Sequence, residues 1–347
     1  MSKKIIFYFV LIFGLFFGSA SFFYFQKIFF WDNTSFEEKA INIYLNKNDD
    51  FSDLILKLEP YLMNIDHFIL AANKKGYTER VKSGKFLIKK GSGNNEIINF
   101  LRSKSLTVNV TFNNQDKVED LAERISDQIE PDSVQLISSF LDSVFLSKNN
   151  LNKDDLISMF IPNSYEFYWN SSANEFRNRM LNEYNKFWNK SRLSKASDLN
   201  LSPKEVIILA SIVHKETSNV NELPVIAGVY VNRLRKGMKL QADPTIIYSI
   251  KRESDNFDTL IRRVYNKDLR IKSKYNTYAY KGLPPGPIGM PDIISIDAVL
   301  NHDKHNYIYF VVDPYNQGSH NFSKTLREHN KKREIYIKWL RRNKIYR

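Results

Sequence analysis

One carboxylate in the sequence stands where an acid–base group could work. The stretch 209–217, LASIVHKET, is predicted to lie in a helix that begins with a capping box formed by Ser202 and Glu205, with Pro203 at its first position. Glu216 follows the apolar residues of this helix at helical spacing, so its side chain continues their face. Burial and the helix C-terminus both favour a protonated carboxyl group. Glu216 is therefore our candidate general acid, and an ordinary polar helix end is the alternative.

Glu216 has no companion carboxylate beside it in its helix, whereas ordinary glycoside hydrolysis needs two carboxyl groups. Glu166, Glu222 and Asp243 are other acids, which the sequence does not place near Glu216. A reaction with an internal nucleophile needs only one acid–base group. Muramic acid residues of peptidoglycan supply such a nucleophile, because their own 6-hydroxyl can attack C1 and form an anhydro ring. This reaction requires no water, metal or cofactor, so we expect no cofactor.

The sequence argues against other common kinds of site. It contains no cysteine, which excludes thiolate chemistry. His302 and His305 are three residues apart, but no His-Glu-x-x-His pattern occurs, so we expect no metal site. No Gly-x-Ser-x-Gly motif is present, and Ser211 falls in mid-helix. The net charge of +13 suits an anionic partner, yet no nucleic-acid-binding motif accompanies it, so we expect no nucleic acid partner.

Polar and aromatic residues in the later loops suit glycan recognition. Amide, carboxylate, hydroxyl and imidazole groups can hydrogen-bond sugar hydroxyls and N-acetyl groups, and tyrosines can pack on sugar faces. We predict that substrate is bound by Asn232, Gln241, Asp243, Tyr275, Asn276, Thr277 and His320. Each has a structural alternative, such as a helix cap for Asn232 or Asp243 and a core position for the tyrosine.

An apolar segment near the N-terminus predicts how the candidate site is held in the cell. Residues 5–25 carry no charge, and at about 1.5 Å per residue they are long enough to cross a hydrocarbon core of about 30 Å. Lys3 and Lys4 precede this span, which predicts a cytoplasmic N-terminus and an extracytoplasmic, periplasmic remainder. A cleaved signal peptide is the alternative, with residues 18–20 as its cleavage region.

The remaining patterns predict an α+β protein, with a single transmembrane helix, a small α+β module and a larger mixed α+β catalytic domain. The predicted strands are 40–45, 83–90, 106–112 and 306–313. The main predicted helices are 51–58, 65–75, 94–104, 118–129, 173–191, 203–217, 224–234 and 326–339. We divide the chain into an anchor (1–31), a module (38–105), a connecting segment (106–159) and the catalytic domain (160–347).

Four stretches together resemble the MltG (YceG-like) family of endolytic murein transglycosylases. They are LASIVHKET (209–217), VIAGVYVNRLRKGMKLQADPTIIY (225–248), YNTYAYKGLPPGPIGMP (275–291) and YIYFVVD…GSHNFSKTLREHN (307–330). Residues 38–104 resemble a LysM-like module, which fits the layout of the family, whereas 113–115 stand where a Gly-containing turn is usual. The resemblance implies that Glu216 is the catalytic glutamate. The helix commonly reads Glu-Lys-Glu in this family, and His214 replaces the first acid here.

The resemblance also implies a reaction and its setting. We expect a single-pass protein of the cytoplasmic (inner) membrane that cleaves the MurNAc–GlcNAc β-1,4 bond of nascent glycan strands. Cleavage would leave 1,6-anhydroMurNAc ends and limit strand length, with Glu216 as the single acid–base group. The implied partners are peptidoglycan strands and peptidoglycan synthases (penicillin-binding proteins). The alternative is a non-catalytic peptidoglycan-binding scaffold of the wall-synthesis machinery.

Overall fold

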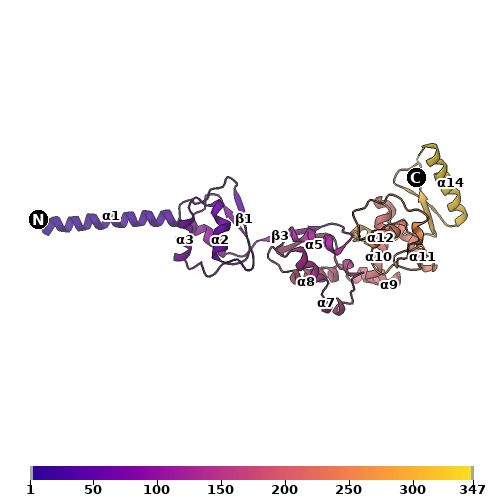
Figure 1. Ribbon diagram of the computed structural model, residues 1–347, viewed down its shortest axis with the longest axis horizontal. Helices are drawn as coiled ribbons and strands as arrows, with labels where there is room; N and C mark the ends of the chain where they lie inside the picture. Colours follow the sequence, from indigo (N-terminus) through magenta and orange to yellow (C-terminus); the bar gives the residue numbers. More distant parts are fainter. Residues whose placement is uncertain (1–2, 345–347) are drawn as a thin grey trace. The chain divides into compact units, whose positions relative to one another are not determined.

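The computed structural model of the chain describes residues 3–344 and has the mixed α+β character predicted from the sequence (Figure 1). The described residues form two compact units. Unit 1 contains the chain up to Val110 together with Gln128–Pro131 and Glu166–Ser172. Unit 2 contains Thr111–Asp127, Asp132–Tyr165 and the chain from Ala173 onward. The predicted domain boundaries at 105 and 159, and the LysM-like character of the module, stay predictions.

The first element, α1 (Lys3–Phe29), is the long apolar helix predicted from the sequence. Its Lys4–Phe29 part is the one helix among residues 3–344 that is long and apolar enough to cross a membrane. Most of its large apolar side chains are exposed, whereas Ile28 in its last turn is buried in the core of unit 1. Exposed apolar side chains along a whole helix suit a lipid environment. The helix is consistent with a membrane anchor or with a signal sequence.

Unit 1 is built on a two-stranded antiparallel sheet in which Ile43 of one strand pairs with Phe86 of the other. The elements are β1 (Ala40–Leu45), α2 (Phe51–Leu58), η1 (Glu59–Tyr61), α3 (Ile65–Lys74), β2 (Gly84–Lys89) and α4 (Asn94–Arg102). Leu45, Phe68 and Phe86 are fully or almost fully buried in its core. These elements confirm the strands and helices predicted for this region, with small differences at their ends.

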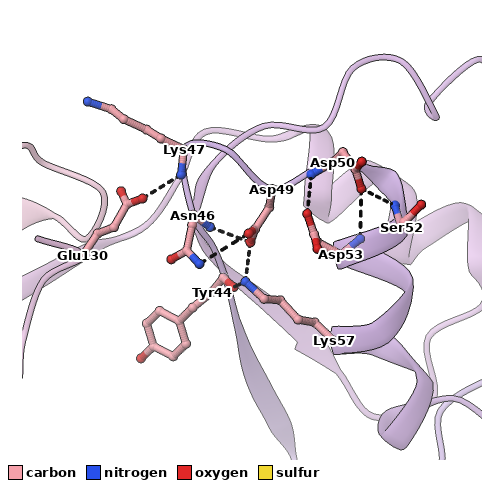
Figure 2. A network of polar contacts seen from close by, with 9 residues as sticks. All are labelled: Tyr44, Asn46, Lys47, Asp49, Asp50, Ser52, Asp53, Lys57 and Glu130. Atoms are coloured by element: carbon pink, nitrogen blue, oxygen red, sulfur yellow. Dashed lines mark hydrogen bonds and ion pairs between the residues drawn. The ribbon is translucent and has the colours of Figure 1, made fainter.

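Figure 2 shows how polar side chains fix the turn between β1 and α2. Asp50 caps α2, and Asp49 forms an ion pair with Lys57 of the same helix. The backbone N–H of Lys47 donates to Glu130 Oε1 at 2.6 Å, which ties the distant segment Gln128–Pro131 to this turn. The turn is therefore held both by its own helix and by a later part of the chain.

A second late segment, Glu166–Ser172, also packs within unit 1. The ring of Trp169 lies 5.0 Å from that of Tyr44, between ring centroids, and Asn170 Nδ2 donates to Ser83 Oγ at 2.8 Å. Unit 1 therefore consists of the N-terminal part of the chain and two short segments from later in the sequence.

Unit 2 is mostly helical. Its first elements are α5 (Val118–Ser126), α6 (Ser133–Phe140), α7 (Ser143–Lys148), η2 (Leu156–Met159), α8 (Ala173–Phe187) and α9 (Lys190–Asp198). The pair of strands β3 (Thr107–Phe112) and β4 (Asn163–Tyr168) has residues in both units. The single helix predicted for 173–191 is wrong: it is broken after Phe187, and Asn189 caps a new helix by accepting the N–H of Arg192 at 3.0 Å.

The later half of unit 2 contains the candidate site. Its elements are α10 (Pro203–Glu216), η3 (Val220–Glu222), α11 (Leu223–Arg235), α12 (Asp243–Glu253), η4 (Asp268–Arg270), α13 (Ile293–Leu300), β5 (Tyr309–Val312), β6 (His320–Ser323) and α14 (Leu326–Arg342). Helices α10, α11 and α13 share one apolar core, to which α10 contributes Val206, Leu209 and Ile212. Strands β5 and β6 form an antiparallel hairpin in which Val312 pairs with His320. Figure 1 shows α10, α11 and α12 grouped together, with α14 at the C-terminal end.

Candidate active site

Helix α10 carries Glu216 to the edge of the core. It begins with the predicted capping box, in which the N–H of Ser202 donates to Glu205 Oε2 at 2.7 Å and the N–H of Glu205 donates to Ser202 Oγ at 3.3 Å. Every residue from Val206 to Val213 is buried, so the helix is enclosed on all sides rather than on the single face predicted from the sequence. Glu216 is the last helical residue and lies where the helix leaves the core.

The pKa of the Glu216 carboxyl is strongly raised. The side chain is partly accessible, but protein atoms crowd its carboxyl group, and this burial is the main reason that its pKa is raised from 4.5 to about 7. The hydroxyl of Tyr230 and the charge of Arg233 oppose this rise, whereas the negative charge of Asp243 contributes to it. A carboxyl group with a pKa near 7 can give up a proton and take one back near neutral pH.

Tyr230 of α11 is the hydrogen-bond donor to this carboxyl group. Its hydroxyl donates to Glu216 Oε1 at 2.5 Å. Burial, together with the charge of Glu216, raises the pKa of Tyr230 well above 10, so the phenol stays protonated and keeps donating. No hydrogen bond to Glu216 Oε2 is present within residues 3–344, so this oxygen has no protein partner there.

Glu216 opens onto a cavity of about 490 Å³, a size typical of small-ligand sites. Three of the predicted substrate-binding residues, Gln241, Asp243 and His320, line the same cavity. Charged and aromatic side chains form much of the remaining wall: Arg233, Tyr278, Tyr309, Phe310, His329 and Arg333. The structure thus brings together residues that are more than a hundred positions apart in the sequence and gives them a common polar and aromatic enclosure.

Asp243 and Gln241 lie at the start of α12. Asp243 is the first residue of that helix, and its Oδ1 accepts the hydroxyl of Tyr278 at 2.5 Å. Gln241 has a φ of 50°, in the left-handed region that non-glycine residues seldom adopt, and its N–H donates to the Thr277 carbonyl at 3.1 Å. Such strained backbone is concentrated at functional sites, where the surroundings hold it in place.

The sequence did not indicate the roles of Tyr230 and Arg233. They are three residues apart on α11, hence on one helix face, and both are almost fully buried. Arg233 donates from Nε to the Ile308 carbonyl and from Nη1 to the Leu240 carbonyl, each at 2.7 Å. It thereby holds the segment before β5 and the loop before α12 around the cavity. The available signal in the sequence is an arginine three residues after a tyrosine within an otherwise apolar predicted helix.

Two of the predicted substrate-binding residues do not line this cavity. Asn232 donates from Nδ2 to the carbonyl of His305 at 2.7 Å and to that of Tyr307 at 3.0 Å. The ring of Tyr275 is buried and packs against Tyr248, with ring centroids 4.8 Å apart. Both side chains thus support the chain around the site, and substrate binding by them stays a prediction.

Asn276 and Thr277 are also buried away from the cavity lining. Asn276 Nδ2 donates to the Leu269 and Ile271 carbonyls at 3.0 and 2.9 Å. Thr277 Oγ1 accepts the backbone N–H of Ala242 at 3.0 Å. These bonds satisfy backbone groups of irregular loops and fix the segment that presents Gln241 and Asp243.

His214, which replaces an acid common at this position in the resembled family, faces away from the cavity. Its Nδ1 lies 3.5 Å from Asp292 Oδ2 and 3.4 Å from Ser295 Oγ, at the N-terminus of α13. The hydrogen bond with His214 and those with Ser295 lower the pKa of Asp292 to about 2, against the opposing effect of burial. Glu216 is therefore the acid of this helix that reaches the cavity. Within residues 3–344, no group of three or more His, Asp or Glu side chains is arranged to hold a metal ion.

An enclosed helix that delivers one carboxyl group of raised pKa to a polar and aromatic cavity is the central feature of this chain. Residues 43–335 match the YceG-like family, and the chain belongs to that family.

Individual relatives agree with this assignment. An endolytic murein transglycosylase of Bacillus subtilis (strain 168) is 36% identical over 207 residues, which cover 58% of this chain and 54% of the relative. An endolytic murein transglycosylase of Streptococcus pneumoniae (serotype 2, strain D39) is 35% identical over 114 residues, which cover 33% of this chain and 20% of the relative. The chain therefore spans about half, or less, of the length of these curated relatives. The crystal structure of a yceG-like protein from Listeria monocytogenes superposes with a TM-score of 0.56 and 26% identity, covering 85% of this chain and 99% of that one.

Proposed function

We propose that this protein is a membrane-anchored endolytic murein transglycosylase with Glu216 as its single acid–base group. The observation that carries the proposal is the Glu216 carboxyl group, whose pKa is raised to about 7, mainly by burial, and which lines a polar and aromatic cavity. Family membership and the names of the relatives support the same activity.

The proposed reaction is balanced without water. Protonated Glu216 gives its proton to the glycosidic oxygen between MurNAc and GlcNAc as the bond from that oxygen to MurNAc C1 breaks. The 6-hydroxyl of the same MurNAc attacks C1, and its proton passes to the Glu216 carboxylate as the new C1–O6 bond forms. The products are a 1,6-anhydroMurNAc end and a free GlcNAc 4-hydroxyl, and Glu216 is again protonated. The Tyr230 hydroxyl stabilises the intermediate carboxylate through its bond to Oε1.

The residues that we propose to contact the substrate are fewer than those predicted from the sequence. Gln241, Asp243 and His320 share the cavity with Glu216 and can reach a glycan bound there. Tyr278 and Tyr309 add aromatic surface on which a sugar ring can pack. Asn232, Tyr275, Asn276 and Thr277 act in this proposal mainly by holding the surrounding loops.

The setting of the reaction follows from the first part of the chain. We propose that α1 is retained as a single-pass anchor in the cytoplasmic membrane, with its N-terminus inside and the following domains outside. Residues 38–105 would form a LysM-like module, 106–159 a connecting segment and 160–347 the catalytic domain. The substrate is nascent peptidoglycan, and penicillin-binding synthases are the proposed partners.

The experiment is mass analysis of the muropeptides released from glycan strands by the full chain in detergent. We expect 1,6-anhydroMurNAc ends from the wild type and none from Glu216→Gln. The matched control is Glu253→Gln, which makes the same change at an exposed residue of the same unit and should leave the product unchanged.

Other product patterns would refute the proposal. Hydrolytic reducing ends would indicate a reaction that uses two carboxyl groups, with Asp243 as the second one in the cavity. If the protein bound glycan strands without cleaving them, and Glu216→Gln did not change the binding, the result would indicate a scaffold of the wall-synthesis machinery.

A further inference from the structure

The carboxylate of Glu222 forms hydrogen bonds with His320, a residue of the cavity wall. Its Oε1 accepts the backbone N–H of His320 at 2.8 Å, and its Oε2 lies 2.8 Å from Nδ1 of the same histidine. Both side chains are largely enclosed, with exposed fractions of 12% for His320 and 13% for Glu222. One carboxylate therefore fixes both the backbone and the ring of His320.

This contact determines which ring nitrogen carries hydrogen. A carboxylate only accepts hydrogen bonds, so Nδ1 must be the donor in the contact with Glu222. In the neutral ring Nε2 is then the acceptor. Within residues 3–344 no protein partner of Nε2 is present, and His320 lines the cavity that contains Glu216. The neutral ring can therefore offer Nε2 as an acceptor to a ligand in the cavity.

The orientation of the ring is also fixed by packing. Phe310 of β5 lies edge-on to His320, with ring centroids 5.3 Å apart, and edge-on to Tyr230 at 5.9 Å. Tyr230 is the donor to Glu216, so a single phenyl ring packs against both polar pairs. Asn219 Nδ2 donates to Ser319 Oγ at 3.5 Å, a second tie between the loop that follows α10 and the hairpin. The position of His320 relative to Glu216 is thus set by contacts from several sides.

We propose that Glu222 is a positioning residue that holds His320 in the form protonated at Nδ1, so that Nε2 accepts a hydrogen bond from a sugar hydroxyl or acetamido N–H in the Glu216 cavity. The proposal rests on the proposed function in that it takes the ligand to be a glycan. Glu222 itself touches no substrate; it acts through the imidazole, as carboxylates do behind histidine ligands of metals.

The substitution Glu222→Gln tests this directly. A glutamine at 222 keeps an oxygen for the backbone N–H of His320, but its amide group donates to Nδ1 and so moves the ring hydrogen to Nε2. Nε2 then becomes a donor. We expect a change from the Nδ1–H to the Nε2–H form in imidazole ¹⁵N spectra of the full chain in detergent micelles. The chain has six histidines, so His320→Asn identifies the signal by its loss.

Kinetics and binding complete the test. If Nε2 accepts a bond in both the bound and the transition state, Glu222→Gln raises KM about tenfold and leaves kcat nearly unchanged. The double variant that combines His320→Asn with Glu222→Gln should have the same KM as His320→Asn alone. If Glu222 had an independent structural role, the double variant would be less active than His320→Asn. Glu253→Gln should change neither parameter.

Once the His320 signal is assigned, the wild type provides a measurement that needs no turnover. Titration with chitohexaose, a GlcNAc oligomer, should shift the Nε2 resonance of His320. Three results would each overturn the proposal. The first is a wild-type ring with its hydrogen on Nε2, and the second is an Nε2 resonance that does not shift at saturating chitohexaose. The third is an unchanged KM in Glu222→Gln although its ring hydrogen has moved to Nε2. A wild type that binds chitohexaose through Nε2 but releases no anhydro ends would instead uphold it and refute the proposed activity.

Discussion

Replacing Tyr230 by phenylalanine should shift the pH dependence of the reaction upward. The Tyr230 hydroxyl donates to Glu216 Oε1 at 2.5 Å and lowers the pKa of that carboxyl group, which still lies at about 7 because burial has the larger, opposite effect. A hydrogen bond to a charged group contributes about 1.5–3 kcal/mol, and 1.36 kcal/mol corresponds to about one pKa unit. Water in the cavity can replace part of the lost bond, so we expect a rise of about one unit, to about 8.

The direction of this shift in the rate profile depends on the proposed role of Glu216 as a general acid. A general acid works in its protonated form, so activity is present below its pKa and lost as the pH rises through it. The alkaline limb of the rate profile should therefore move from about pH 7 to about pH 8 in Tyr230→Phe. The assay is the initial rate of 1,6-anhydroMurNAc formation between about pH 5 and 10. Tyr278→Phe, which removes a hydroxyl from Asp243 instead, is the control. An unmoved limb in Tyr230→Phe, or one moved to lower pH, would refute the reasoning.

Three further predictions concern the charges around the same carboxyl group. Because the folded-state pKa of Glu216 lies above its usual 4.5, its stabilising contribution is complete below about pH 4.5 and lost as the pH rises through about 7. After allowance for screening by cavity water, Glu216→Gln should raise the free energy of unfolding at pH 9 by about 1–2 kcal/mol and change it little at pH 4.5. Urea unfolding measures both values, and equal effects at the two pH values would contradict this prediction. Asp243→Asn removes a charge that raises the pKa of Glu216, so whatever activity remains should have its alkaline limb at lower pH, which rate profiles would reveal. His214→Ala should leave that limb in place, because His214 contacts Asp292 rather than the cavity, and a shifted limb would show otherwise.

Local signals in the sequence were sufficient to predict α10 and the place of Glu216 on it. The capping residues and the apolar spacing are read within a few positions of one another, and the structure confirms the resulting helix. The extent of its burial was not predicted, because enclosure depends on α11, α13 and their loops, which pack on it from distant parts of the chain. The same dependence explains why the sequence does not indicate the roles of Tyr230 and Arg233, whose contacts come from distant segments.

The types of the predicted substrate-binding residues do not reveal which side chains reach the cavity. An asparagine amide binds a sugar hydroxyl or a backbone carbonyl equally well, and buried irregular loops have many carbonyl groups to satisfy. Asn232 and Asn276 are engaged by such carbonyls, whereas Gln241 and His320 line the cavity. The choice depends on tertiary burial, which no local pattern in the sequence encodes.

The two carboxyl groups in the cavity lie at opposite kinds of helix end. Glu216 is the last residue of α10, where the helix macrodipole disfavours negative charge, and Asp243 is the first residue of α12, where the macrodipole favours it. Each accepts a tyrosine hydroxyl, so hydrogen bonding alone does not distinguish them. Burial does, and the charge on Asp243 adds to it by raising the pKa of Glu216. The carboxyl group suited to exchanging a proton near neutral pH is therefore that of Glu216, beside which Asp243 lies in the same cavity. One such carboxyl group suits a reaction whose nucleophile belongs to the substrate.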